Sequence, residues 1–155
     1  MSFRITGLEP ALFQHLYGLS DEALARHGAR RVLVDQSPGV PDRIELRDVA
    51  PGESAILLNH GHQPADTPYR ASHAIFIREG AKTAHSAIDM IPESLLLRPI
   101  SLRAFDAGGE MVDADLADGT TIEALIEHFF ANPAVAYLHA HYTRHGCYAA
   151  RIDRA

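Results

Sequence analysis

Two His-x-His pairs, His60 with His62 and His139 with His141, have the residue type and spacing that most favour chemistry in this sequence. Side chains at positions i and i+2 of a β-strand project from the same face, so a strand aims both imidazoles of a pair at one place. Imidazole is the commonest metal ligand in proteins, and it also serves as a general base near neutral pH. The four histidines are therefore candidate metal ligands, with zinc as the candidate cofactor, and His139 and His141 are candidate catalytic residues.

The second pair has the better defined position. A strand is predicted from Val135 to Tyr142, in which Tyr137 shares a face with His139 and His141 while the intervening residues are apolar. His60 and His62 instead open a polar segment, predicted to be a long loop that ends at Ser72. A shared site requires the two pairs to converge in space. The alternative is that His139 and His141 are hydrogen-bonded residues on a half-exposed strand face.

A second set of residues could hold an anion, because a guanidinium binds a carboxylate or phosphate through two parallel N–H bonds. Its members are Arg43, Arg70, Ser72, His73, Arg103 and Tyr137. The alternative for Arg103 is an ion pair with Asp113 across a predicted hairpin. For Arg43 and Arg70 the alternative is a solvated surface position.

Two further kinds of chemistry have weaker support. Cys147, the only cysteine, lies near His145, and a Cys–His pair can generate a thiolate, although a buried lone cysteine usually serves packing. Asp106, Asp113 and Asp115 could work as paired carboxylates for acid–base chemistry, but surface charge on a hairpin is the simpler explanation. No Gly-x-Gly-x-x-Gly, Walker loop, nucleophile elbow, His-Glu-x-x-His or Cys-x-x-Cys motif is present.

The elements expected to position these residues favour an α+β fold with a largely antiparallel mixed sheet and two or three packed helices, in one domain spanning residues 1–155. Strands are expected at residues 3–5, 31–35, 43–47, 55–59, 73–78, 100–106, 111–116, 135–142 and 147–152. Helices are expected after Pro10, after a Ser20 cap, from Pro92, and after a capping box formed by Thr120 and Glu123.

The hairpin between residues 100–106 and 111–116 also has a predicted register. A three-residue loop at residues 107–109, with glycine in its last position, pairs Leu102 with Ala114 and Ala104 with Val112 on one apolar face. A two-residue loop would pair Leu102 with Asp115 and place a charge on that face.

Composition excludes several classes of protein. The formal net charge of −6 argues against nucleic-acid binding, which needs clustered basic residues. No apolar stretch is long enough to be a transmembrane helix, and the first residues do not resemble a signal peptide. A single cysteine fits a reducing compartment. We therefore expect a cytoplasmic protein with no nucleic-acid or membrane partner.

The sequence resembles, over nearly all of its length, a bacterial family known as domain of unknown function 1203. The segments that carry the resemblance are residues 19–24 (Leu-Ser-Asp-Glu-Ala-Leu), 51–53 (Pro-Gly-Glu), 57–60 (Leu-Leu-Asn-His), 68–76 (Pro-Tyr-Arg-Ala-Ser-His-Ala-Ile-Phe), 101–106 (Ser-Leu-Arg-Ala-Phe-Asp), 137–141 (Tyr-Leu-His-Ala-His) and 146–151 (Gly-Cys-Tyr-Ala-Ala-Arg). The resemblance implies no activity, cofactor or catalytic residue. Members often carry Pro-Cys-Arg where this chain has Pro41-Asp42-Arg43, a departure that counts against thiol chemistry.

The leading hypothesis is a small-molecule site where residues 60–73 meet the strand face that carries Tyr137, His139 and His141. It would bind a small polar or anionic molecule, with arginines nearby and metal assistance, and His139 or His141 would act as general base or ligand. The alternative is a non-catalytic interaction or regulatory protein with structural histidines, which an exposed apolar patch or a symmetric dimer would favour. Enzymatic activity and assembly into a homo-oligomer are left open.

Overall fold

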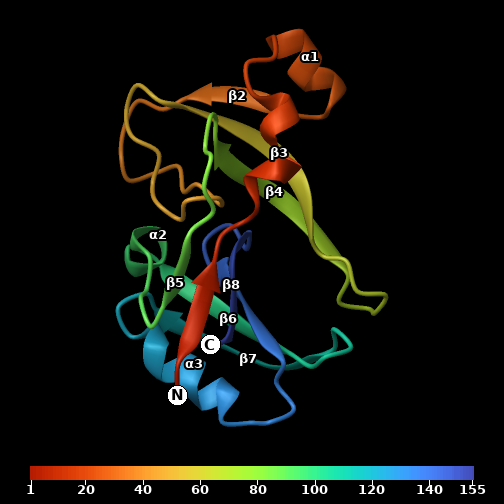
Figure 1. The fold of residues 1–155 in the computed structure, drawn as a ribbon, viewed down its shortest axis with the longest axis vertical. Helices are drawn as coiled ribbons and strands as arrows, with labels where there is room; N and C mark the ends of the chain where they lie inside the picture. Colours follow the sequence, from red (N-terminus) through yellow and green to blue (C-terminus); the bar gives the residue numbers. More distant parts are fainter.

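Nine strands form two antiparallel sheets in the computed structural model, which describes residues 1–155 (Figure 1). The six-stranded sheet has the order β5-β1-β9-β8-β6-β7 and contains β1 (Phe3–Thr6), β5 (Ser86–Ile88), β6 (Pro99–Phe105), β7 (Met111–Asp118), β8 (Tyr137–Tyr142) and β9 (Tyr148–Arg154). The three-stranded sheet has the order β2-β3-β4 and contains β2 (Arg30–Leu33), β3 (Ser54–Gln63) and β4 (Ala71–Arg78). The α+β prediction is confirmed, with the strands divided between two sheets.

Three short helices and two 3-10 turns complete this single α+β domain. They are α1 (Asp21–Arg26), α2 (Glu93–Leu96) and α3 (Ile122–Phe130), with η1 (Pro10–Leu12) and η2 (Gln14–Leu16). Ser20 caps α1 as predicted, because its hydroxyl accepts a hydrogen bond from the backbone N–H of Ala23 at 3.2 Å. The predicted capping box at α3 is wrong. The helix is preceded by Thr121, whose hydroxyl donates to the carbonyl of Asp118 instead of capping.

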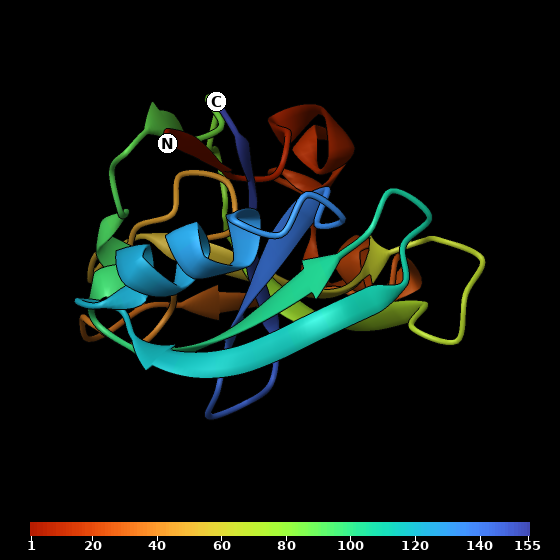
Figure 2. The same ribbon diagram turned by 90° about the horizontal axis from the view of Figure 1, so that it is seen from below.

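The main core lies between α3 and one face of the six-stranded sheet, an arrangement seen from below in Figure 2. The apolar stripe of α3 supplies Ile122, Ile126, Phe129 and Phe130, which pack with buried residues of β6, β8 and β9. Burial of each such side chain contributes about 1.5–3 kcal/mol relative to exposure. Leu138 and Ala140 of β8 belong to this core, so His139 and His141, which alternate with them, project from the opposite face.

The β6–β7 hairpin has the predicted three-residue loop but a different register. The backbone N–H of Asp106 donates to the carbonyl of Glu110 at 2.9 Å, and Gly109 has a φ of 84°, which closes a loop at residues 107–109. Phe105 then pairs with Met111. An irregularity between Ala104 and Phe105 shifts the pairs farther from the loop by one residue, so that Ala104 pairs with Asp113. The loop length alone therefore does not fix the register of the strands.

The predicted pairs of the hairpin are wrong as a result. Leu102 pairs with Asp115, and Arg103 lies opposite Ala114 instead of Asp113. The charge of Asp115 is tolerated on this face because β7 is the edge strand, where the carboxylate is exposed to solvent. The predicted ion pair between Arg103 and Asp113 is absent.

The three-stranded sheet differs from the prediction at two places that matter for the site. Strand β3 continues to Gln63, so both His60 and His62 lie on a strand and the predicted loop shortens to residues 64–70. Residues 43–47 form turns instead of a strand. The cause is the buried Asp42, whose carboxylate accepts backbone N–H bonds from Ile44, Glu45 and Arg78 at 3.1, 2.6 and 2.7 Å.

The end of the β3–β4 hairpin rests on the six-stranded sheet, and both views place it beside the β6–β7 loop (Figures 1 and 2). Gln63 donates a side-chain hydrogen bond to the hydroxyl of Tyr137 at 3.0 Å, and Thr67 donates to the carbonyl of Gly109 at 3.3 Å. A Cβ added at Gly109 would lie 2.4 Å from the Cβ of Ala65, so only glycine permits this approach. None of the helices has the length and apolar character needed to cross a membrane.

Candidate functional site

Three of the four candidate metal ligands lie together where the two sheets meet. His62 comes from β3, and His139 and His141 come from β8. Each offers a ring nitrogen, and these nitrogens all lie within 4.8 Å of one another. The ring centroid of His62 is 4.9 Å from that of His141 and 6.1 Å from that of His139. The structure thus brings one member of the first pair next to both members of the second, and we call these three residues the histidine cluster.

The position of the cluster follows from strand alternation. Leu138 and Ala140 point into the main core, which turns His139 and His141 toward the other face of the sheet. On that face the rings of His62 and Tyr148 pack against both imidazoles, and His139 is 3% exposed and His141 1% exposed. The cluster is therefore a set of buried polar groups, which normally find hydrogen-bond partners.

One ring nitrogen of each histidine in the cluster lacks a partner. The Nδ1 atom of His141 lies 3.0 Å from the carbonyl oxygen of Gly146. Because a carbonyl can only accept, Nδ1 carries the proton and Nε2 keeps its lone pair. That Nε2 atom, Nδ1 of His139 and Nδ1 of His62 are buried without any hydrogen-bond partner. Each unpaired nitrogen costs free energy unless something else binds it.

The environment keeps all three imidazoles neutral. Burial is the main cause that lowers the pKa of His62 to about 4 and the pKa values of His139 and His141 to about 3. The charge of Arg103 lowers all three pKa values further, as does repulsion from neighbouring histidines. The neutral imidazole is the form that donates a lone pair to a metal.

Aromatic rings form the wall of the cluster. The ring of Tyr148 stacks on His62 with a centroid distance of 5.3 Å and an angle of 7°, and it meets His139 and His141 edge-on at 5.2 and 5.8 Å. Phe105 packs against His139 at 5.0 Å. These contacts fix the orientation of the imidazoles, and sequence reasoning missed both residues. The sequence predicts a strand at residues 147–152 that contains Tyr148. It does not predict which strand lies beside this one, and so it does not place the ring of Tyr148 against the histidines.

His60, the fourth candidate ligand, lies outside the cluster. Its ring packs edge-on against Phe13, with a centroid distance of 5.8 Å. In the β3–β4 pairing, His60 lies opposite His73. The register of β3 is irregular between His60 and Gln63, so the simple alternation expected of i and i+2 residues does not hold there.

Two arginines lie opposite His139, Arg103 on β6 and Arg151 on β9, and of these Arg151 is already paired with Asp153. Arg103 is the one without a partner. It lies on β6 directly opposite His139 and projects from the same face of the sheet. It is half-buried, and no carboxylate or other acceptor binds its guanidinium. Burial lowers its pKa. A guanidinium in this position could hold an anion next to the three histidines.

The other candidate ligand-binding residues are dispersed. Tyr137 flanks His139 at a centroid distance of 5.2 Å, with the guanidinium of Arg151 4.1 Å above its ring. Arg70 and Ser72 are exposed near the end of the β3–β4 hairpin. His73 is half-buried, with Nδ1 3.1 Å from the carbonyl of Ala74.

Arg43 was expected either in an anion site or at the solvated surface, and it is in fact 1% exposed. It lines a separate cavity together with Cys147 and His145. Cys147 is a buried free thiol. The solvated alternative for Arg43 is therefore wrong.

Comparison with known proteins places the chain in a family. Residues 39–154 match the model of the family described as protein of unknown function (DUF1203), and the chain belongs to that family. The match confirms the resemblance inferred from the sequence, and it includes β3 to β9 and all three histidines of the cluster. Neither the curated proteins nor the solved structures contain a match to this chain.

Proposed function

We propose that this protein binds one divalent metal ion, zinc in the first place, through His62, His139 and His141. A small polar or anionic molecule would bind at the open position of the ion, held by Arg103. The observation that carries the proposal is the convergence of three histidines that each offer a ring nitrogen within 4.8 Å of the others, in a cluster where every ring also has a buried nitrogen without a hydrogen-bond partner. A cation bound between the rings would supply a partner that the chain itself does not.

The donor set fits zinc. Zinc accepts histidine nitrogens at about 2.0–2.1 Å, which at tetrahedral angles separates two ligands by about 3.3 Å. Nitrogens that now lie within 4.8 Å of one another reach that spacing through small side-chain rotations. The bond from His141 to the carbonyl of Gly146 is the kind of outer contact that orients a ligating imidazole. Imidazole also suits copper, iron and nickel, so zinc is favoured but not unique.

Three protein ligands leave one coordination position open, which is typical of catalytic zinc sites. An ion held in this way would lower the pKa of a bound water to about 7 or polarise a bound carbonyl or phosphoryl oxygen. Arg103 would fix the orientation of an anionic ligand by two N–H bonds. A cytoplasmic location is part of this proposal, because a chain with one cysteine cannot form an internal disulfide.

The competing function is that of a non-catalytic interaction or regulatory protein whose histidines only pack. The stacking of Tyr148 on His62 favours it, since aromatic packing alone can retain buried imidazoles. This alternative gives no partner to the buried nitrogen that each ring of the cluster leaves unpaired.

Metal analysis of protein purified without a histidine tag tests the proposal. After equilibration with excess zinc and removal of loosely bound ions, we expect about one zinc per chain. Replacement of His139 and His141 by alanine should abolish that zinc. His128→Ala, an exposed histidine on α3, is the matched control and should leave it unchanged. Wild-type protein that retains no more zinc than the double variant would refute the proposal.

A further inference from the structure

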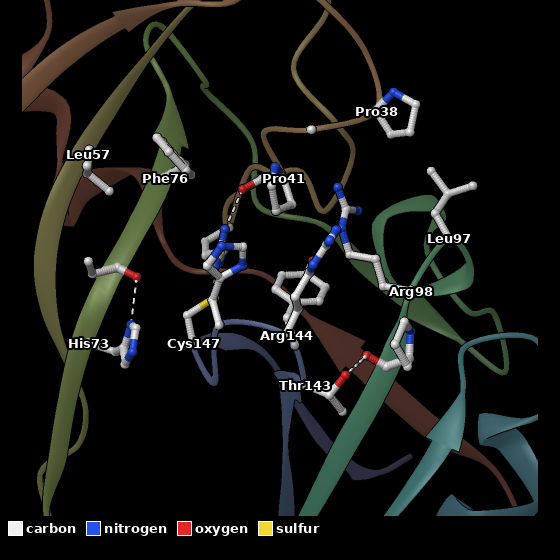
Figure 3. A pocket seen from close by; sticks show the side chains of 16 residues that line it. Pro38, Pro41, Leu57, His73, Phe76, Leu97, Arg98, Thr143, Arg144 and Cys147 are labelled. Atoms are coloured by element: carbon white, nitrogen blue, oxygen red, sulfur yellow. Dashed lines mark hydrogen bonds between the residues drawn. The ribbon is translucent and has the colours of Figure 1, made fainter.

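A large cavity lies apart from the histidine cluster, between the three-stranded sheet and the turn that joins β8 to β9. It has a volume of about 890 Å³. Figure 3 shows Leu57 and Phe76 on one side of it, with Arg98 and Leu97 opposite and Cys147 between them. The lining contains arginines and histidines but no aspartate or glutamate. The cavity therefore combines apolar walls with an excess of positively charged side chains in its lining.

Arg43 is the source of that charge at the buried end. It is 1% exposed, and its guanidinium donates to the carbonyls of Tyr148 and Pro41 at 2.7 and 2.6 Å and to the sulfur of Cys147 at 3.0 Å. All three acceptors are uncharged groups in their ordinary states. A guanidinium has five N–H donors, so two remain without a partner. A buried cation with free donors lacks the counter-ion that such a group needs.

Three partly buried arginines near this part of the fold show the kind of partner that Arg43 lacks. Arg31 and Arg78 pair with glutamates, and Arg98, which lines the same cavity, binds both carboxylate oxygens of Asp48 at 2.7 and 2.6 Å. Arg43 is more buried than any of them and has no carboxylate partner. Asp48 is near enough for the charge of Arg43 to help lower its pKa, but both of its oxygens already bind Arg98, so no carboxylate of the chain accepts directly from Arg43. An anion in the cavity would supply that direct partner.

The rest of the cavity indicates which kind of anion would fit it. The ring of Tyr142 lies between the guanidinium groups of Arg43 and Arg98, at 4.9 and 5.2 Å from them. Arg144 lines the cavity as well; it is exposed and has no hydrogen-bond partner. A bare inorganic ion would leave the apolar walls in contact with water. An organic anion would cover them.

We propose that this cavity is a second ligand site, which binds a small organic anion with its oxyanion head on Arg43 and its apolar body against Leu57 and Phe76. The head is a carboxylate or a phosphate, since the free donors of a guanidinium suit either group. The site does not depend on a metal in the histidine cluster, because none of the three clustered histidines lines the cavity.

Cys147 provides a reporter inside the cavity, because it is the only cysteine of the chain and lies in the lining beside Arg43. Iodoacetate and iodoacetamide are nearly equal in size and differ in charge, so the ratio of their alkylation rates measures the field at this sulfur. A cleft of one sign raises the local concentration of the opposite ion by about tenfold or more. We expect the iodoacetate-to-iodoacetamide ratio to rise about tenfold from the urea-unfolded chain to the folded protein. An unchanged ratio would overturn the proposal.

Variants localise the effect. Arg43→Gln removes the buried charge directly, but it also removes hydrogen bonds that hold the turn. Arg144→Gln changes only an unpartnered residue of the lining and should reduce the ratio about threefold. Arg26→Gln removes an exposed arginine of α1 that does not line the cavity, and it should leave the ratio unchanged. Equal effects of Arg144→Gln and Arg26→Gln would show that net charge, and not the cavity, sets the ratio.

Protection of Cys147 from iodoacetamide identifies the ligand chemistry. Benzoate, phenyl phosphate, inorganic phosphate and benzyl alcohol are the probes, with EDTA present so that metal plays no part. We expect benzoate or phenyl phosphate to slow alkylation in a saturable manner, and the stronger of the two to identify the head group. Protection by benzyl alcohol equal to that by benzoate, by inorganic phosphate equal to that by phenyl phosphate, or by no probe at all would contradict an organic-anion site.

Discussion

His141 donates its Nδ1–H to the carbonyl oxygen of Gly146 at 3.0 Å, and this bond leaves the Nε2 lone pair of His141 free within the histidine cluster. Gly146 has a φ of 74°, and its own N–H donates to the carbonyl of Tyr142 at 2.8 Å. The turn between β8 and β9 thereby determines both the position of the acceptor and the tautomer of the histidine. A local backbone conformation and a candidate metal ligand are linked in this way.

Gly146→Ala tests that link. No atom lies within 4 Å of the Cβ that alanine would add, so the cost is purely conformational, about 1–2 kcal/mol at this positive φ. We expect the free energy of unfolding in urea to fall by that amount. The zinc affinity should fall about 10–100-fold, the usual effect of disturbing an outer contact to a ligand. Gly39→Ala, at a glycine outside the positive-φ region whose added Cβ would make only an ordinary contact, 3.8 Å from the carbonyl oxygen of Gln36, should change neither quantity appreciably.

The contact between the two hairpins should be equally sensitive. Gly109→Ala places a Cβ 2.4 Å from the Cβ of Ala65 at a position with a φ of 84°. The β3–β4 hairpin must then move away from β6–β7, and His62 moves with it. We expect a loss of about 2–3 kcal/mol in unfolding free energy, together with weaker zinc binding. Gly108→Ala has its nearest contact at 3.4 Å and is the neighbouring control; an equal effect of both substitutions would contradict this account.

Glu79 is expected to be a major electrostatic contributor to stability. Its carboxylate accepts two bonds from Arg31 and one each from Ser54 and Gly18, at 2.7–2.9 Å. The hydrogen bonds from Arg31 are the main cause that lowers its pKa from 4.5 to about 2. A lowered carboxyl pKa gives stability that is present above pH 4.5 and lost as the pH falls toward 2. Glu79→Gln should therefore cost about 2–3 kcal/mol at pH 7 and much less near pH 2.5; urea titrations at both pH values, with the exposed Glu22→Gln as control, check this.

Acid should destabilise the metal-free protein through its buried histidines. Burial lowers the pKa of His139 and of His141 from 6.5 to about 3, so in this window the unfolded chain binds protons that the folded chain does not. Stability is complete above pH 6.5 and declines as the pH falls toward 3, by up to about 1.4 kcal/mol per pH unit for each histidine. Urea unfolding in EDTA between pH 7.5 and 4.5 measures the slope. A double His139→Phe, His141→Phe variant should show a smaller slope, and an identical slope would be inconsistent with neutral buried imidazoles.

The strand that carries His139 and His141 could be predicted because its apolar residues alternate with polar ones. The same reasoning failed for β3, because His60, Gly61 and His62 have no apolar residue among them and therefore resemble a loop. Only the pairing with β4 shows that the strand continues to Gln63. The convergence of the two His-x-His pairs is a property of the tertiary structure, and local pattern does not contain it.

Arg43 illustrates a different limit of sequence reasoning. Its alternation with Ile44 and Glu45 predicted a half-buried strand, whereas the backbone bonds to Asp42 produce a turn that buries the guanidinium. Propensity favours exposure of arginine, and only the enclosing turn and the cavity reverse that preference. The hairpin register failed for a related reason, because a bulge leaves no mark in the alternation of residues.

The most direct test of the central claim is zinc titration of two single variants, His62→Ala and His60→Ala, followed by calorimetry or competition with a chelating dye. These histidines belong to the same strand and are separated by one residue, but only His62 belongs to the cluster. We predict that His62→Ala weakens zinc binding beyond the roughly 100-fold that loss of an outer contact can cause, while His60→Ala retains wild-type affinity. Equal affinities of the two variants, or a larger loss in His60→Ala, would contradict a metal centre made of His62, His139 and His141.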